Sequence, residues 1–426
     1  MNSLINPNEI FNPGSKLPSE GQGQKGKKTF SSLRNRNFRL LWIGGVISHI
    51  GDDMQLVAVS WLVLILTKSP FLMGVTNLLQ GLPRLFFSLL GGVVADRVNR
   101  HKLLTLFQGI EMFLAFFFAY LVIGEEIQFW HILMLVPIFG FLKSIYQLCR
   151  QAYVFDLVGR EELMNALALH SSGMNLSKII GPSLAGVLIG IWGVGWCLFI
   201  NGLSFIAILI SFFMMHPPAS FKRGNYSSGI LQDLGEAFVY LKKNKTILLM
   251  IAASFSTIVF GLHAQVILPL FAQSILNVGA SGFGFLVGAT GAGAVLGGII
   301  LAGLGDLKGK GYLFLLSSLV YGFLLILFSY SSWFFLSLFI LFLVGMVEMF
   351  MRTINQTLVQ LLSPDELRGR ILGVYMLDRG MKPLGGFLMG AVASLFGAPL
   401  TLSLGAGICM FVALGLLFRS SRIRAL

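Results

Sequence analysis

The chain has 426 residues, of which 55% are hydrophobic and only 12% are charged, a balance that excludes an ordinary soluble domain and predicts a polytopic membrane protein. Its formal net charge of +13 would suit a nucleic-acid-binding protein, but the basic residues are spread between apolar segments, which excludes nucleic acid as the partner. The cysteines Cys149, Cys197 and Cys409 fall inside apolar segments without paired spacing, so neither a disulfide framework nor a zinc site is predicted.

The apolar segments predict an all-α membrane protein. A helix needs about 20 apolar residues to cross the roughly 30 Å hydrocarbon layer, and about twelve segments reach that length. In chain order we place them at residues 40–66, 71–95, 103–123, 131–157, 164–189, 191–215, 246–274, 281–304, 311–330, 333–361, 370–393 and 397–418.

Polar stretches divide these helices into two groups of six. Residues 1–38 predict a disordered cytoplasmic tail, and residues 419–426 a short tail at the other terminus. The stretch 216–245 predicts a cytoplasmic linker that contains a short amphipathic helix on the membrane surface. The two bundles then occupy residues 39–215 and 246–418.

The basic residues between the predicted helices alternate in a way that orients the chain. If the N-terminus is cytoplasmic, almost all of them face the cytoplasm, and only Lys68 faces out. The positive-inside rule favours this arrangement, which requires an even number of crossings and places both termini in the cytoplasm.

Ionisable side chains inside the predicted helices indicate function. Each costs roughly 2.5–3.5 kcal/mol at a lipid-facing helix centre, so we expect them to face one another or a water-filled cavity. They are Asp52, Asp53, Arg84, Glu111, Lys143, Arg150, Lys178, Glu348, Arg352, Asp378, Arg379 and Lys382.

The first candidate proton carriers are carboxylates with an evident cationic partner. Asp52 and Asp53 lie midway along the first predicted helix and Arg84 midway along the second, so a carboxylate–arginine pair is predicted. Glu348 is the next candidate, with Arg352 one turn away.

The remaining charges leave alternatives open. Asp378 either takes part in proton coupling or forms a purely structural pair with Lys382 at i, i+4. Three cations either line the cavity, where they would favour an anionic or catechol-like substrate, or pair with Glu111 and the Asp52 region; these are Lys143, Arg150 and Lys178.

Matching features in the two bundles predict an internal repeat. Residues 92–102 are echoed at 306–310, and Arg150 is echoed by Arg352. Further matches pair 161–163 with 365–367 and 181–186 with 383–386. Four matches in order at a near-constant offset predict two parallel, pseudo-symmetric six-helix bundles.

The stretch 92–102 resembles a family signature. In the major facilitator superfamily the second helix is followed by Gly-x-x-x-Asp-Arg-x-Gly-Arg-Arg/Lys, which is matched here by Gly92, Asp96, Arg97 and Arg100. His101 departs from the pattern before Lys102, and Asn99 stands where glycine is usual. Because Asn tolerates a positive φ, we expect the turn to be kept.

This resemblance implies a gate. The signature aspartate, Asp96, would cap the N-terminus of the eleventh helix near residues 368–371 and latch the two bundles together on the cytoplasmic side. The alternative is that Arg97, Arg100 and Lys102 only fix the topology.

A second motif lies in the fifth predicted helix. It is similar to the Gly-Pro-x-x-Gly-Gly pattern of drug–proton antiporters and is carried by Gly181, Pro182, Ala185 and Gly186, with Ser177 at the usual upstream glycine. Small residues allow close helix packing, and proline frees a carbonyl that lets the helix bend. In the family this motif marks exporters.

The likeness covers nearly everything after residue 30 and is closest to bacterial exporters of siderophores and macrolides. It implies a twelve-helix transporter of the bacterial inner membrane that exports a small amphipathic molecule, a drug, macrolide or siderophore, by proton antiport. The alternatives are a lysolipid flippase or importer of the same fold, or a non-transporting membrane sensor or scaffold. No enzyme activity, metal or cofactor is expected, no nucleotide-binding loop is visible, and the protein is expected to be monomeric.

Overall fold

The computed structural model describes residues 30–97, 99–216, 240, 244–305, 309–364 and 367–420, with the side chains of 84–97, 368–370, 372–373 and 376–379 left aside. The described residues form helices and contain no strand. The helices are η2 (Ser31–Arg34), α1 (Arg36–Thr67), α2 (Pro70–Arg97), α3 (Arg100–Ile123), α4 (Phe129–Trp192), α5 (Val194–Met214), α7 (Lys245–Phe260), α8 (Ala264–Ser274), α9 (Gly279–Leu304), α10 (Lys310–Ser329), α11 (Phe334–Leu362), α12 (Arg368–Phe396) and α13 (Ala398–Arg419).

Among the described residues, nine helical segments are long and apolar enough to cross a membrane. One of them, α4, has 64 residues and would be about 96 Å long if straight, roughly three times the hydrocarbon thickness. Gly159 interrupts it with φ 70° and ψ −174°, a conformation that favours glycine, and divides it into two spans. With α2 and α12 packed among these helices, the arrangement accommodates the twelve predicted crossings.

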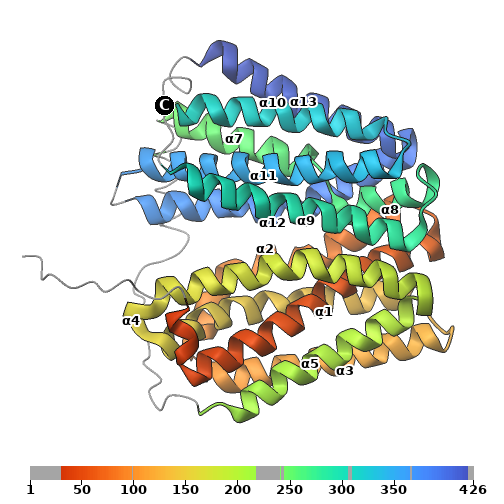
Figure 1. The fold of residues 1–426 in the computed structure, drawn as a ribbon, viewed down its shortest axis with the longest axis vertical. Coiled ribbons are helices and arrows are strands. Elements are labelled where there is room, and N and C mark those ends of the chain that lie inside the picture. Colours follow the sequence, from red (N-terminus) through yellow and green to blue (C-terminus); the bar gives the residue numbers. More distant parts are fainter. Residues whose placement is uncertain are drawn as a thin grey trace, which may run out of the picture.

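The helices form two groups that lie side by side (Figure 1). The first contains α1 to α5 and the second α7 to α13. The groups meet along two helix pairs, α2 against α12 and α4 against α9. Large apolar side chains such as Phe113, Phe213 and Phe411 remain exposed on the outside, as a lipid-facing surface requires.

The predicted helix 246–274 is interrupted. The predicted crossing matches the apolar segment Lys245–Ser274, within which residues Gly261 to His263 separate α7 from α8. The Leu262 amide donates to the Tyr321 hydroxyl at 3.0 Å, which replaces a lost helical hydrogen bond inside the membrane. Broken helices of this kind place polar backbone where it is buried in protein rather than exposed to lipid.

The predicted N-terminal tail 1–38 is too long. Residues 31–34 already form η2, and α1 begins at Arg36. Ser31 Oγ donates to Glu162 Oε2 at 2.6 Å, and Asn35 Nδ2 donates to the Leu157 carbonyl at 2.7 Å, so this segment is fixed to the corner of α4. The predicted amphipathic helix of the linker and the final tail from 421 on lie outside the described residues.

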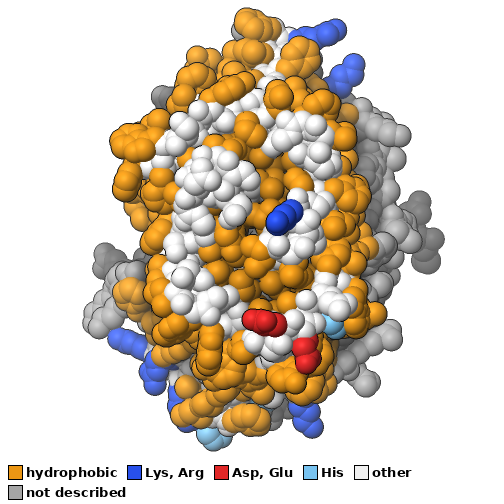
Figure 2. All heavy atoms as spheres, turned by 90° about the vertical axis from the view of Figure 1, so that its right-hand side faces the viewer, with side chains coloured by type: hydrophobic (Ala, Val, Ile, Leu, Met, Phe, Trp, Pro, Cys, Tyr) orange, Lys and Arg blue, Asp and Glu red, His pale blue; other side chains and the backbone are white. Residues whose placement is uncertain are grey.

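The two ends of the bundle differ in charge. One end, called the basic end here, carries η2 and the last turn of α13, together with Arg100 and Lys310. The other, called the opposite end, carries the turns after α1, α3 and α10. Figure 2 shows that hydrophobic side chains cover most of the opposite end and that few charged side chains interrupt them.

Candidate functional site

A cluster of ionisable side chains lies between α1 and α4. Lys143 Nζ is 3.0 Å from Asp52 Oδ2, and His49 Nδ1 is 3.6 Å from the same oxygen. The other ring nitrogen of His49, Nε2, contacts the guanidinium of Arg150. A carboxylate, an imidazole and two cations therefore form one chain of contacts within the membrane-spanning region.

Helical spacing explains why these four side chains meet. His49 and Asp52 are three residues apart and share one face of α1. Lys143 and Arg150 are seven residues apart and share one face of the first span of α4. Because α1 packs along α4, the two faces are brought together.

Arg150 is the most enclosed cation of this cluster. Only 4% of the residue is exposed, and its Nε has no hydrogen-bond partner among the residues that the structure describes. The head group fits against α1 because Gly45 has no side chain, and a Cβ there would collide with the guanidinium. A buried cation with an unsatisfied donor costs free energy, so this arrangement is a candidate for a functional role rather than a stabilising one.

Asp53 contacts the second span of α4 and lies within electrostatic reach of Lys143. Ser177 Oγ donates to Asp53 Oδ2 at 2.8 Å, and a Cβ at Gly181 would lie 2.8 Å from Asp53 Cβ. The antiporter-like motif thus begins in direct contact with the second carboxylate of α1. Lys178 lies within electrostatic reach of Asp53 as well.

Glu111 reaches the cluster from α3. It is 4% exposed and accepts from Gln108 Nε2 at 2.5 Å, while Gln108 Oε1 accepts from Ser48 at 3.2 Å. Asp52 and Lys143 both lie within electrostatic reach of Glu111. Of the two alternatives left open for Lys143, these contacts favour the one in which it pairs with Glu111 and the Asp52 region.

Asp52 has a lysine ammonium as its partner. We expected a pair between Arg84 of the second helix and Asp52 or Asp53, which stays a prediction, and the structure places the ammonium of Lys143 beside Asp52. Depth along neighbouring helices predicts which residues lie level with each other, whereas rotation about the helix axis decides which ones face each other. The side chain of Arg84 lies outside the described residues.

The second group of helices holds a simpler pair. Arg352 donates to Glu348 Oε1 at 3.3 Å along one face of α11, as their spacing predicts, and their side chains are 41% and 33% exposed. The side chains of Asp378 and Arg379 lie outside the described residues, and Lys382 is exposed. The predicted Asp378–Lys382 pair therefore stays a prediction.

The signature stretch is described only in part. The side chains of Gly92, Asp96 and Arg97 lie outside the described residues. Arg100 forms an ion pair with Asp156 at 2.8 Å, which joins α3 to α4 at the basic end. Asn99 has φ −63°, so the chain does not use its tolerance of a positive φ here; instead it caps α3 by accepting from the Lys102 amide at 3.1 Å.

The other end of the antiporter-like motif lies against the second group of helices. Ser281 Oγ donates to the Gly186 carbonyl at 3.1 Å, and a Cβ at Gly186 would lie 2.9 Å from Gly284 Cα. Trp61 of α1 also stacks on Phe283 with ring centroids 6.1 Å apart. Through these contacts α1 and α4 of the first group pack against α9 of the second group toward the opposite end.

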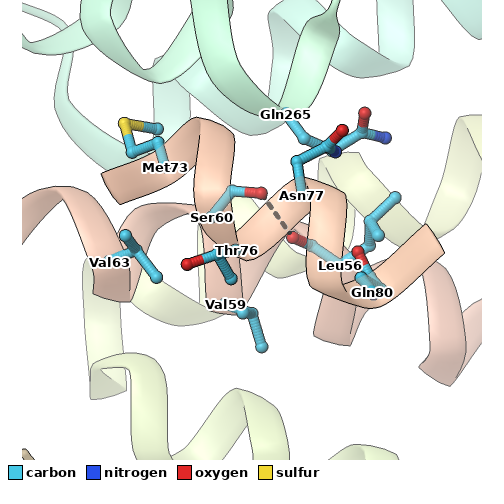
Figure 3. A pocket seen from close by; sticks show the side chains of 9 residues that line it. All are labelled: Leu56, Val59, Ser60, Val63, Met73, Thr76, Asn77, Gln80 and Gln265. Atoms are coloured by element: carbon cyan, nitrogen blue, oxygen red, sulfur yellow. Dashed lines mark hydrogen bonds between the residues drawn. The ribbon is translucent and has the colours of Figure 1, made fainter. Parts of the chain in front are cut away.

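A small polar pocket lies where α1, α2 and α8 meet (Figure 3). Asn77 and Gln80 come from α2, Gln265 comes from α8, and Ser60 of α1 donates to the Leu56 carbonyl at 2.9 Å. Its volume of about 10 Å³ has room for about one water molecule. Amide groups from both groups of helices therefore converge without space for a larger molecule in this conformation.

Sequence reasoning missed several of these residues. His49 was not singled out, although a histidine three residues before an aspartate inside an apolar segment was a usable signal. Gln108 and the Asn77–Gln265 pair gave no signal, because neutral polar residues are common in membrane helices and only packing brings these together.

Comparison with known proteins matches this chain to one family model and to bacterial transport proteins. The model of the family described as transmembrane secretion effector matches residues 27–426. The staphyloferrin A transporter of Staphylococcus aureus is 24% identical over 86% of this chain and 90% of its own length. An enterobactin exporter of Shigella boydii is 26% identical over 79% of this chain and 80% of its own length.

Solved transporters share the fold. The nucleoside transporter NupG superposes with a TM-score of 0.73 at 15% identity, covering 90% of this chain and 100% of that one. A bacterial homologue of the lysosomal transporter Spinster, in an inward-facing and unoccupied conformation, gives 0.67 at 16% identity, with 92% and 96% covered.

Proposed function

The chain belongs to the transmembrane secretion effector family of the major facilitator superfamily, and from this membrane transporter's geometry we propose that it is a proton-driven exporter of a small, siderophore-like molecule. The observation that carries the proposal is the Asp52 carboxylate, which two neighbouring groups, Lys143 and His49, approach inside the membrane. A scaffold needs no such group at this depth, whereas a proton carrier does.

The cluster suggests how proton and substrate exchange. With Asp52 ionised, its charge is balanced by Lys143. The ionised carboxylate would accept a hydrogen bond from the substrate while the site is open to the cytoplasm. Protonation of Asp52 from outside would remove that acceptor and favour release of the substrate, and loss of the proton to the cytoplasm would restore the form that binds substrate, so that proton and substrate exclude each other. Asp53, held by Ser177, is the alternative carrier.

Alternating access would follow from rocking of the two groups of helices. Contacts between α4 and α9 support a closed opposite end, while Lys143, Glu348 and Arg352 keep between 33% and 41% of their side chains exposed. Charges with that exposure in a membrane are best accommodated by a water-filled cleft that opens toward the basic end.

The orientation in the membrane follows from charge. We place the basic end in the cytoplasm, in accord with the positive-inside rule, and with it both termini. In this orientation Asp96 precedes Asn99 at the cytoplasmic surface, and α12 begins at Arg368. The latch between Asp96 and that helix start stays part of the proposal: Asp96→Asn should reduce export without reducing protein abundance, and unchanged export would remove the latch.

The substrate class is drawn from the relatives and from the site. The relatives are named for staphyloferrin A and for enterobactin. Three cations from α4, Lys143, Arg150 and Lys178, suit a molecule that carries negative charge.

The test uses the purified protein in proteoliposomes with a pH-sensitive dye, and staphyloferrin A and enterobactin as the probes. We expect proton movement that depends on the probe and is lost in Asp52→Asn. Inward accumulation of a probe in vesicles of known orientation would favour an importer, and lysolipid movement a flippase. If neither probe, nor lysolipid, nor protons move, the remaining interpretation is a membrane sensor or scaffold.

A further inference from the structure

A second pocket lies at the opposite end of the bundle, away from the ionic cluster. It has a volume of about 530 Å³, within the range of small-molecule sites. Both groups of helices line it: Ile65 and Lys68 at the end of α1, Leu270 and Gln273 on α8, and Ala398 at the start of α13. A molecule held there would touch both halves of the transporter at once.

The lining has the composition of a site for an amphipathic anion. Leucine, isoleucine, alanine and proline side chains supply apolar walls, and Gln273 and Ser274 supply neutral hydrogen-bonding groups. Of the described residues that line the pocket, Lys68 alone carries a charge. A single ammonium beside apolar walls selects for one negative group attached to an apolar body.

The position of Lys68 is fixed by the backbone. The residue ends α1 in the left-handed conformation, with φ 49°, and its amide donates to the Leu64 carbonyl at 2.8 Å. Its side chain is exposed, so an anion arriving from the adjacent aqueous phase can reach it. The surrounding surface is mostly hydrophobic, which leaves few competing charges (Figure 2).

In this structure the opposite end is closed around the pocket. Phe71 of α2 contacts Phe387 of α12 with ring centroids 5.7 Å apart, and a Cβ at Gly74 would lie 3.0 Å from the Phe387 carbonyl. Rocking the halves apart at this end would separate α1 from α8 and α13, and with them the walls of the pocket. A ligand that binds one conformation better than the other shifts the population toward it.

We infer that this pocket binds small amphipathic anions from the external side and that their binding holds the opposite end closed. The external direction rests on the proposed function. The exported molecule, if it is such an anion, would then slow its own export as it accumulates outside. This is a binding site distinct from the ionic cluster between α1 and α4.

Binding is tested first, without transport. 1-Naphthalenesulfonate is the probe, with 1-naphthamide as its neutral analogue, and affinity is measured by equilibrium dialysis on the protein in nanodiscs. We expect the sulfonate to bind better than the amide, and Lys68→Gln to weaken sulfonate binding about fivefold, as loss of one partly exposed charge contact would. Lys68→Arg should restore it.

The matched control is Lys102→Gln, which removes an exposed lysine at the basic end. It should leave sulfonate binding unchanged. A second variant, Ser274→Trp, fills the pocket while leaving Lys68 in place and should abolish binding. Equal binding of sulfonate and amide, or equal binding to wild type and Lys68→Gln, would overturn the site.

Closure is tested by distance. Spin labels on Glu126→Cys and Tyr330→Cys report the separation of the two halves at the opposite end, since both positions are exposed and the native cysteines are buried. Added sulfonate should shift the distances toward the shorter, closed population, and should not do so with Lys68→Gln. Sulfonate binding without a change in the spin-label distances would contradict the inference that binding holds this end closed. That result is independent of the transport assay, which tests the proposed function.

Discussion

The two halves of the molecule treat intramembrane charge differently. In the first half, side chains from α1, α3 and α4 meet in one cluster that includes Asp52, Lys143, Arg150 and Glu111. In the second half the described pair, Glu348 and Arg352, lies one turn apart on a single helix. A cluster that joins three helices changes their packing when its protonation changes, whereas a pair on one helix does not.

This difference indicates which half can couple protonation to movement of the helices. Protonation of a carboxylate that bridges helices alters contacts between those helices, and the antiporter-like motif connects Asp53 on α1 to Gly284 on α9 through Gly181 and Gly186. The internal repeat therefore preserves the helix arrangement of the halves, while the charges whose side chains the structure describes are distributed differently in them. Experiments that exchange or remove charges in each half test this asymmetry.

The largest effect is expected for Asp52→Asn. Loss of the bridging carboxylate should reduce proton-coupled export at least about tenfold, equivalent to roughly 1.4 kcal/mol in the barrier. The measurement is probe-dependent proton flux in proteoliposomes at matched protein abundance. Asp156→Asn is the control, because it removes an aspartate of the same half that pairs with Arg100 at the basic end. Coupling retained in Asp52→Asn would reassign the carrier, with Asp53→Asn the next variant.

The stability of the cluster is tested by a double-mutant cycle. Lys143→Met leaves Asp52 without its nearest cation and should destabilise the protein by about 1–3 kcal/mol, since both side chains are partly exposed. Adding Asp52→Asn should restore part of that loss. The thermal midpoint in detergent measures both, and additive losses would show that the two residues do not interact.

Contact between the halves is tested at Gly186. Gly186→Ala places a methyl group 2.9 Å from Gly284 Cα and from two carbonyl oxygens of α9, so the helices must separate slightly. We expect export to fall several-fold with little change in proton binding, a loss of about 1 kcal/mol in the barrier. Gly109→Ala, where nothing lies within 4 Å, is the control and should behave like wild type.

The smallest effect is expected for Glu348→Gln. The pair with Arg352 is one-third or more exposed, and such pairs contribute about 0.3–0.5 kcal/mol on a helix. Export and the thermal midpoint should both stay close to wild type. A loss as large as that of Asp52→Asn would contradict the asymmetry between the halves.

Much of the fold was readable from sequence because a lipid environment leaves few choices. Apolar length predicted the crossing helices, and α1, α9 and α13 begin and end within about four residues of the predicted bounds, an error typical of such reading. Helix-face spacing predicted the Glu348–Arg352 pair. The break between α7 and α8 was missed, because it is stabilised by Tyr321, a residue about sixty positions away.

The sequence by itself determined that the chain is a membrane-embedded helical protein with charges that must avoid lipid, because hydrophobic length and the cost of a buried ion are local properties. Only the tertiary structure decided which charges meet, with Lys143 beside Asp52 and His49 between Asp52 and Arg150, and it decided that both halves line the two pockets. Those choices depend on how helices are rotated and packed, and no single helix carries that information.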